Sequence, residues 1–140
     1  MIAELSEALR HKEATCASLT RTALERIEEE QPRLNAFITV MADSAQARAV
    51  ELDRELAAGR DRGPLHGIPV ALKDLVHVRG VRTTGGSLVY KDYVAAETAE
   101  VARRLEEAGA VIVGKAGLHE LAYGITSNNP HFGAIRNPRD

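Results

Sequence analysis

Residues 67 to 74 read Gly-Ile-Pro-Val-Ala-Leu-Lys-Asp, an apolar run that ends in two charged residues. A short apolar run of this kind is typical of a buried strand, and Pro69 favours a position at a sheet edge or an irregular start. We therefore expect a strand from Pro64 to Leu72 that delivers Lys73 at its carboxyl end.

A lysine at the rim of a buried strand loses hydration, which disfavours the ammonium and makes the side chain able to act as a general base. The alternative is structural, because most such lysines extend their charge into water, and Asp74 could pair with Lys73 at the surface. Position alone leaves both interpretations of Lys73 open.

Apolar residues recur at helical spacing before this strand and predict three helices. The first opens the chain, the second follows a Thr15 N-cap and stops before Pro32, and the third ends at Gly59. A short strand from Ala36 to Met41 separates the last two. The defining apolar positions are Ile2, Leu5 and Leu9, then Cys16, Leu19, Ala23 and Ile27, then Ala45, Ala49, Leu52 and Leu56.

The chain after Lys73 continues the alternation of helix and strand. We expect a short strand from Val76 to Val81, a flexible polar loop from Arg82 to Ser87, and a buried strand from Val111 to Val113. A fourth helix precedes this last strand; Thr98 caps it, Val101, Leu105 and Ala108 share its apolar face, and Gly109 ends it.

This order predicts one α/β domain over residues 1–140, with helices packed on a partial mixed sheet. The helical part covers about 1–31, the α/β part about 36–122, and a loop-rich end 123–140, which we expect to be a long ordered loop or an exposed tail.

Composition narrows the function classes. The net charge is −2, no block of like charge exceeds three residues, and no apolar run approaches 18 residues, so neither nucleic acid nor a membrane is indicated as a partner. The single cysteine, Cys16, falls on the apolar side of a helix and is expected to be a buried thiol. We expect a cytoplasmic protein.

Two familiar motifs match only in part. Gly109 to Lys115 has the spacing of a phosphate-binding loop, but Ala116 lacks the hydroxyl that would bind magnesium, and the intervening residues form a strand sequence. His119-Glu120 begins like a zinc motif, yet Tyr123 stands where the second histidine would lie. Ser87 and Ser127 lie in no nucleophile elbow. No metal or cofactor is predicted.

Several segments together carry a resemblance to one family. They are Gly63-Pro-Leu-His-Gly-Ile-Pro-Val-Ala-Leu-Lys-Asp74, Thr83-Thr-Gly-Gly-Ser87, Val111-Ile-Val-Gly-Lys115, Glu120-Leu-Ala-Tyr-Gly124, Asn129-Pro-His-Phe-Gly133 and Asn137-Pro138. In this order they resemble the opening part of the amidase signature family, over nearly all 140 residues.

The resemblance implies amide cleavage by a serine nucleophile, a second serine in a cis peptide, and a lysine that corresponds to Lys73. It implies a small-molecule amide as substrate, with Gly124, Thr126 and Ser127 as substrate contacts, although an ordinary turn would explain these three equally well. Both family serines belong to segments that follow the Asn-Pro motif and are not among these 140 residues, so we expect the chain alone to be inactive. Ala116-Gly117 also departs from the family pattern, which commonly has threonine and asparagine there.

Three further interpretations stay open. The loop from Tyr123 to Phe132 resembles free-standing amidases more than the A subunit of the tRNA amidotransferases, which is the nearest alternative. A non-catalytic module that self-associates through uncovered sheet edges is the second. Nucleotide binding at Gly114-Lys115 is the third.

Overall fold

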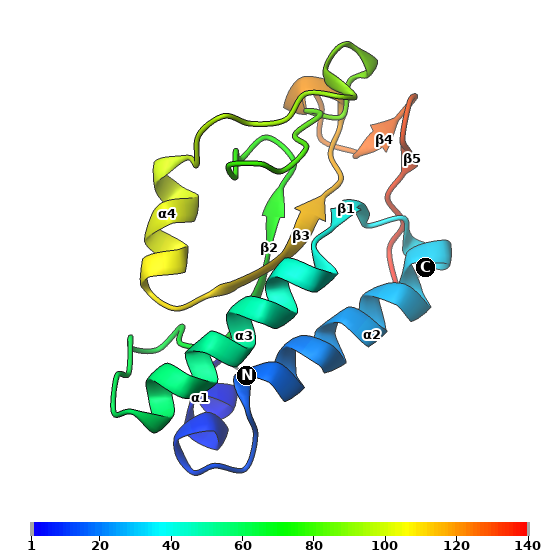
Figure 1. The fold of residues 1–140 in the computed structure, drawn as a ribbon. Helices are drawn as coiled ribbons and strands as arrows, with labels where there is room; N and C mark the ends of the chain where they lie inside the picture. The colour runs from blue at the N-terminus through cyan, green and yellow to red at the C-terminus, as the bar shows by residue number, and fades with distance from the viewer. Residues whose placement is uncertain (1, 140) are drawn as a thin grey trace.

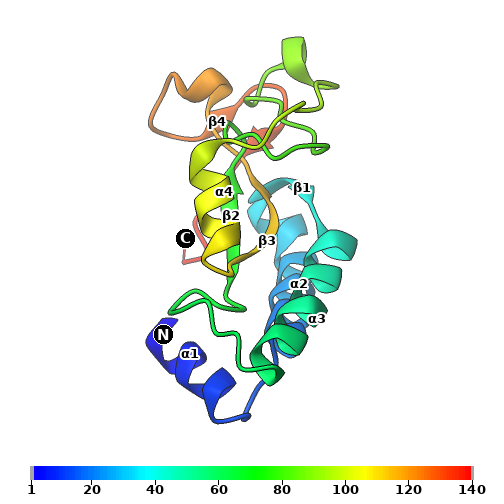
Figure 2. The same ribbon diagram turned by 60° about the vertical axis from the view of Figure 1, so that its left-hand side comes forward.

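The computed structural model describes residues 2–139, which form three layers, a small sheet with a helical layer on each face. Two long helices, α2 (Cys16–Leu34) and α3 (Ala42–Ala57), lie side by side on one face, and α4 (Glu100–Glu107) covers the other face (Figures 1 and 2). The helix α1 (Ile2–Arg10) lies at the end of the structure opposite β4 (Figure 2). The predicted α/β class, with helices on a partial mixed sheet, is confirmed.

The sheet has the order β1-β3-β2, with β1 (Phe37–Val40), β2 (Pro69–Lys73) and β3 (Val111–Ala116). The central strand β3 pairs parallel with β2 and antiparallel with β1. Its first five residues are buried, as expected for a strand covered on both faces. Pro69 begins the edge strand β2, where its missing N–H leaves no ladder position empty.

The alternation of side chains along β3 divides the core into two clusters. Val111 and Val113 pack with Cys16, Ala49 and Leu52 on the side of α2 and α3, whereas Ile112 packs with Leu72 and Ala102 on the side of α4. The predicted faces of the second and third helices therefore point into the core, and Cys16 is fully buried. On the predicted face of the first helix Leu5 and Leu9 join the core, but Ile2 is 52% exposed.

Thr15 caps α2 as predicted, and Ser18 completes a capping box with it. The helix does not stop before Pro32, however, but continues to Leu34 and ends at Asn35 in the left-handed conformation. Pro32 lies in the last turn of the helix, where its missing N–H removes one helical hydrogen bond. The Gln31 side chain bonds both the N–H and the carbonyl of Phe37 and so ties the end of α2 to β1.

The segments around β2 and α4 differ from the prediction in four ways. The strand starts at Pro69 and not at Pro64, because the preceding residues turn. Residues 76–81 form no strand but a series of turns. Ala99 rather than Thr98 is the N-cap of α4, since the Thr98 hydroxyl accepts from the Arg79 N–H instead. Val101 is 54% exposed, so the buried face of α4 is formed by Ala102 with Leu105.

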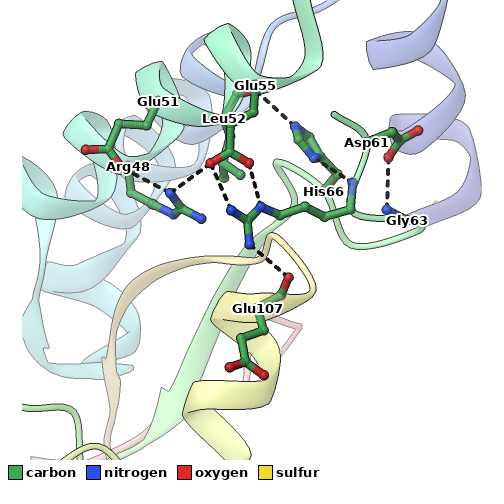
Figure 3. A network of polar contacts seen from close by, with 9 residues as sticks. Arg48, Glu51, Leu52, Glu55, Asp61, Gly63, His66 and Glu107 are labelled. Atoms are coloured by element: carbon green, nitrogen blue, oxygen red, sulfur yellow. Dashed lines mark hydrogen bonds and ion pairs between the residues drawn. The ribbon is translucent and has the colours of Figure 1, made fainter. Parts of the chain in front are cut away.

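The loop that leads into β2 is held to both helical layers by Arg62 and His66. Figure 3 shows His66 with the partners of these two residues, Leu52, Glu55 and Glu107. The Arg62 guanidinium bonds the Glu55 carboxylate at 2.5 and 2.9 Å and the carbonyl of Glu107 at 3.2 Å. Buried His66 accepts from the Arg62 N–H at its Nδ1 and therefore donates from Nε2 to the Leu52 carbonyl at 3.0 Å. These contacts fix where β2 begins.

The end of the chain is an ordered loop rather than a free tail. It contains two short paired strands, β4 (Asn128–Asn129) and β5 (Gly133–Ala134), and the Arg136 N–H bonds the carbonyl of Leu34 at the end of α2. Among residues 2–139, no helix has the length and apolar character needed to cross a bilayer.

Candidate active site

The carboxyl ends of the parallel strands β2 and β3 meet at one edge of the sheet, and the irregular segments of the chain gather there. The loop after β2, the turn after β3 and the β4–β5 pair all lie beyond this edge (Figures 1 and 2). Ligand sites in sheets with parallel strands occur preferentially at such an edge. Lys73 and Lys115 each lie at the end of one of these two strands.

Lys73 is the last residue of β2, as predicted, and its side chain is exposed. The ammonium makes no hydrogen bond or ion pair with any residue between 2 and 139, so it is not occupied by a structural role in this part of the chain. The expected loss of hydration is not present, because no other described element covers this position. The alternative of a surface pair between Lys73 and Asp74 is wrong, since Asp74 is fully buried.

Asp74 pairs instead with Lys115. The Lys115 Nζ donates to Asp74 Oδ1 at 2.9 Å, and both side chains have an exposed fraction of 0%. Lys115 lies opposite Leu72 in the register of β2 and β3 and so reaches Asp74 from the neighbouring strand. A buried ion pair is retained only when further hydrogen bonds satisfy both groups, and here they do.

The segment from Thr83 to Ser87 supplies those hydrogen bonds. The Thr83 hydroxyl accepts from Lys115 Nζ at 2.9 Å, and Asp74 Oδ2 accepts from the Thr84 N–H at 2.8 Å and the Thr84 hydroxyl at 2.6 Å. The Gly85 N–H donates to the Asp74 carbonyl at 3.0 Å. All five residues of the segment are buried, so the expected flexible polar loop is in fact an ordered part of the interior.

Asn129 ties the end of the chain to this segment. Its buried side chain donates to the carbonyls of Gly86 at 2.7 Å and Leu118 at 3.0 Å, and its Oδ1 accepts from the N–H groups of His131 and Phe132. Asn129, which precedes Pro130, therefore connects the 83–87 segment, the turn after β3 and the β4–β5 pair.

Glu120 lies in the same region with a polar partner on each side. The Ser87 hydroxyl hydrogen-bonds the carboxylate and lowers the pKa of Glu120, and His131, at 3.2 Å from Oε1, adds to this effect. The two residues that follow, Leu121 and Ala122, have φ of 50° and 59°, a conformation that is costly for residues with a Cβ. The Leu121 N–H donates to the Gly85 carbonyl at 2.7 Å, which anchors this turn to the 83–87 segment.

The three predicted substrate contacts lie together on the loop after this turn. Gly124 and Thr126 are exposed and Ser127 is half-buried. The Thr126 hydroxyl lies 3.4 Å from His119 Nδ1, and the His119 ring packs so closely on Gly124 that a Cβ there would lie 2.6 Å from it. The structure thus places the three near one another at the edge where Lys73 ends β2, without a contact between them and Lys73.

A pocket of about 440 Å³ opens beside the same edge. It is mostly apolar, and its lining includes Leu75, His77 and Gly85 together with Tyr90, Tyr93 and Leu121. The aromatic side chains contact one another, with ring centroids 5.6 Å apart for His77 and Tyr93 and 6.5 Å for Tyr90 and Tyr93. Such a pocket suits an apolar group rather than a charged one.

Sequence reasoning missed the buried group of Asp74, Lys115, Thr83 and Thr84. One signal was available: Lys115 ends an apolar run in the same way as Lys73, but local spacing connects it only with a phosphate-binding motif. The partner of Lys115 lies 41 residues earlier in the chain, and no local spacing indicates that contact.

Comparison with known proteins gives one consistent family. The family model described as Amidase matches residues 18–140. The A subunit of glutamyl-tRNA(Gln) amidotransferase from Halorhodospira halophila is 45% identical over 139 residues, and that from Koribacter versatilis is 39% identical over 133 residues. These alignments cover 99% and 95% of this chain, but 28% of each relative.

Solved structures agree with the family model. The native peptide amidase from Stenotrophomonas maltophilia superposes with a TM-score of 0.91 at 36% identity, over 99% of this chain and 30% of that protein. The chain thus spans less than a third of the length of these relatives.

Proposed function

The chain belongs to the amidase signature family, and on that premise we propose that the protein containing it cleaves carboxylic amides with Lys73 as its base. One observation carries the proposal: the lysine of the matched family segment stands free at the carboxyl end of β2. Its neighbour in sequence, Asp74, is fully buried and paired elsewhere, so Lys73 is the lysine at this edge that remains available for proton transfer.

In the proposed mechanism, neutral Lys73 accepts a proton through a bridging serine from the nucleophilic serine. The nucleophile oxygen forms a bond to the amide carbon, the C–N bond breaks, and the proton passes back along the same path to the leaving amine. Water then hydrolyses the acyl-enzyme by the reverse proton path. Both serines belong to family segments outside these 140 residues, and Lys73 is this chain's contribution.

The substrate contacts are proposed on the loop of residues 124–127. The exposed Thr126 hydroxyl can donate to a substrate carbonyl, and the closeness of Gly124 to His119 holds this loop in place. A small-molecule amide is the proposed substrate class, with no cofactor, since proton transfer and acyl transfer need none.

An amidase assay on the complete product of the reading frame tests the proposal. Lys73→Met should lower kcat by about 100-fold or more, because general-base catalysis contributes on the order of 10² to 10⁴ in rate. Lys91→Met is the matched control, since Lys91 is also an exposed lysine of the loop region and lies in none of the six sequence segments that carry the family resemblance. Equal activity of the Lys73→Met variant and the parent would refute Lys73 as the base.

A second candidate is the A subunit of a glutamine-dependent tRNA amidotransferase, because the curated relatives at 45% and 39% identity carry that name. The two candidates differ in the amide donor. Glutamine hydrolysis that requires added partner proteins would favour the amidotransferase, whereas turnover of other amides by the purified protein alone would favour a free-standing amidase.

Self-association is a third component of the proposal. β1 and β2 are the outer strands of the sheet formed by the described residues, and exposed strand edges can pair with another chain. Light scattering on the 140-residue chain should then show dimers or larger species, and a clean monomer would count against pairing. A cytoplasmic location, proposed from the single cysteine, which is buried and free, can be checked by cell fractionation.

A further inference from the structure

Two lysines lie at the carboxyl ends of the two parallel strands, Lys73 as the last residue of β2 and Lys115 as the last but one of β3, and they have opposite environments. Lys73 is exposed and without a partner among the described residues, whereas Lys115 is the largest fully buried side chain in residues 2–139. A buried ammonium is costly, so its retention here calls for a role beyond packing.

We propose that Lys115 is a positioning residue: with Asp74 and Thr84 it fixes the direction in which Lys73 leaves β2. The inference rests on the proposed function of Lys73 as the base. It concerns residues that neither the family match nor the sequence reasoning assigns to the reaction.

Asp74, the residue next to Lys73, is hydrogen-bonded through both its backbone and its side chain. The Asp74 N–H donates to the Ala116 carbonyl at 2.9 Å, and its carbonyl accepts from the Gly85 N–H at 3.0 Å. Its carboxylate receives Lys115 on one oxygen and both donors of Thr84 on the other. With both backbone groups and both carboxylate oxygens bonded, the backbone beside Lys73 has one conformation.

Side chains of successive residues at a strand end point to opposite faces. Leu72 and Asp74 are buried, and Lys73 between them is exposed. Fixing Asp74 on the inner face therefore fixes the Cα–Cβ direction of Lys73 on the outer face. A base misplaced by about 1 Å can lose on the order of 100-fold in rate.

The experiment compares four variants of the complete protein by kcat, KM and thermal midpoint. Lys115→Met should lower kcat by about 100-fold with KM changed less than about threefold, because none of the proposed substrate contacts Gly124, Thr126 and Ser127 is hydrogen-bonded to Asp74 or Lys115. Arg62→Met is the matched control: it removes an ion pair that holds the opposite end of β2 and should lower the thermal midpoint while kcat stays within about twofold.

Two further variants keep the test decisive if Lys115→Met does not fold. Thr84→Val removes one hydroxyl donor to Asp74 and should lower kcat by about tenfold, whereas Thr84→Ser retains the hydroxyl and should restore it. If kcat of Lys115→Met or Thr84→Val falls no further than that of Arg62→Met at an equal loss of thermal midpoint, the positioning role is wrong. If Lys73→Met itself keeps its activity, the proposed function fails first, and the two failures are thereby distinguished.

Discussion

Asp53 in α3 caps the helix that begins at Cys16. Its Oδ1 accepts from the Cys16 N–H at 2.7 Å and its Oδ2 from the Ala17 N–H at 3.1 Å. The first amide groups of a helix have no partner within the helix, and a carboxylate there also complements the helix dipole. One side chain of α3 thus fixes the start of α2.

Asp53→Ala should lower the free energy of unfolding by about 1–3 kcal/mol, because two half-buried N–H groups lose their acceptor. Urea unfolding followed by circular dichroism measures the change. Glu51→Ala is the control on the same helix: its carboxylate bonds Arg48 at the surface, so a loss below about 0.5 kcal/mol is expected. An equal loss in both variants would contradict a specific cap.

The Cys16 thiol should resist alkylation in the folded protein. Burial raises the pKa of Cys16 from 9.0 to about 12, and the neighbouring Asp53 carboxylate adds to the shift. The thiolate is the reactive form, so labelling by iodoacetamide at about pH 8 should proceed only as fast as the protein unfolds. Rapid stoichiometric labelling without unfolding would refute this.

The same shift predicts a loss of stability at alkaline pH. A group with a raised pKa in the folded state favours folding fully below its unfolded pKa, and this contribution is lost as pH rises from about 9 to about 12. Cys16→Ala should flatten the pH dependence of the urea midpoint in that window. A slope unchanged from that of the parent would assign the alkaline loss to other groups.

Glu55 should contribute to stability at neutral pH and lose that contribution in acid. The two hydrogen bonds from Arg62 lower the pKa of Glu55 from 4.5 to about 2. A group with a depressed pKa stabilises the fold above its unfolded value, and the contribution disappears as pH falls from about 4.5 to about 2. The thermal midpoints of the parent and of Glu55→Gln should therefore differ at neutral pH and converge near pH 2.

Gly114 in the centre of β3 should not tolerate a side chain. A Cβ there would lie 2.6 Å from the Thr39 carbonyl oxygen and 2.9 Å from the Phe37 ring, so alanine would push β1 away from β3. We expect Gly114→Ala to cost about 1–3 kcal/mol, the usual range for overpacking. Gly59→Ala is the comparison: no atom lies within 4 Å of its Cβ, and only the φ of 78° opposes it, at about 1 kcal/mol. Urea unfolding of both variants measures the difference.

Those parts of the fold that depend on local pattern could be predicted from the sequence. Helical spacing predicts apolar faces that contain Cys16 in α2 and Ala49 and Leu52 in α3, and these side chains are buried. Residues Val111 to Val113 are predicted as a strand covered on both faces, and they are buried in β3. Residues 76–81 have the apolar pattern of a strand, but they form turns, and their valines pack into the core cluster that contains Leu72 and Ala102. An apolar pattern predicts burial, and burial alone does not distinguish a strand from a packed turn.

The candidate site could be predicted only in its exposed half. Lys73 is found because its segment matches a family, and its position at the end of β2 is as expected. For Asp74 the sequence offers only the alternative of a surface pair with Lys73, because it shows Asp74 beside Lys73 but not within reach of Lys115. Burial of a charge depends on a counter-charge from another strand, and that is a property of the sheet register rather than of the segment.

The strand order β1-β3-β2 has a consequence for the growing chain. Of the three strands in this sheet, β3 is the last in sequence and lies between β1 and β2. The two strands made first, β1 and β2, are therefore not neighbours and share no hydrogen bonds of the sheet. A ribosome that has translated the chain only up to the start of β3 has made α2 and α3, which can already pack, but no ladder of this sheet. Asp74 likewise has no counter-ion until Lys115 has been added to the chain. The helical layer is therefore available as a template during synthesis, and the carboxyl edge with both lysines can take shape only after β3 inserts between its partners.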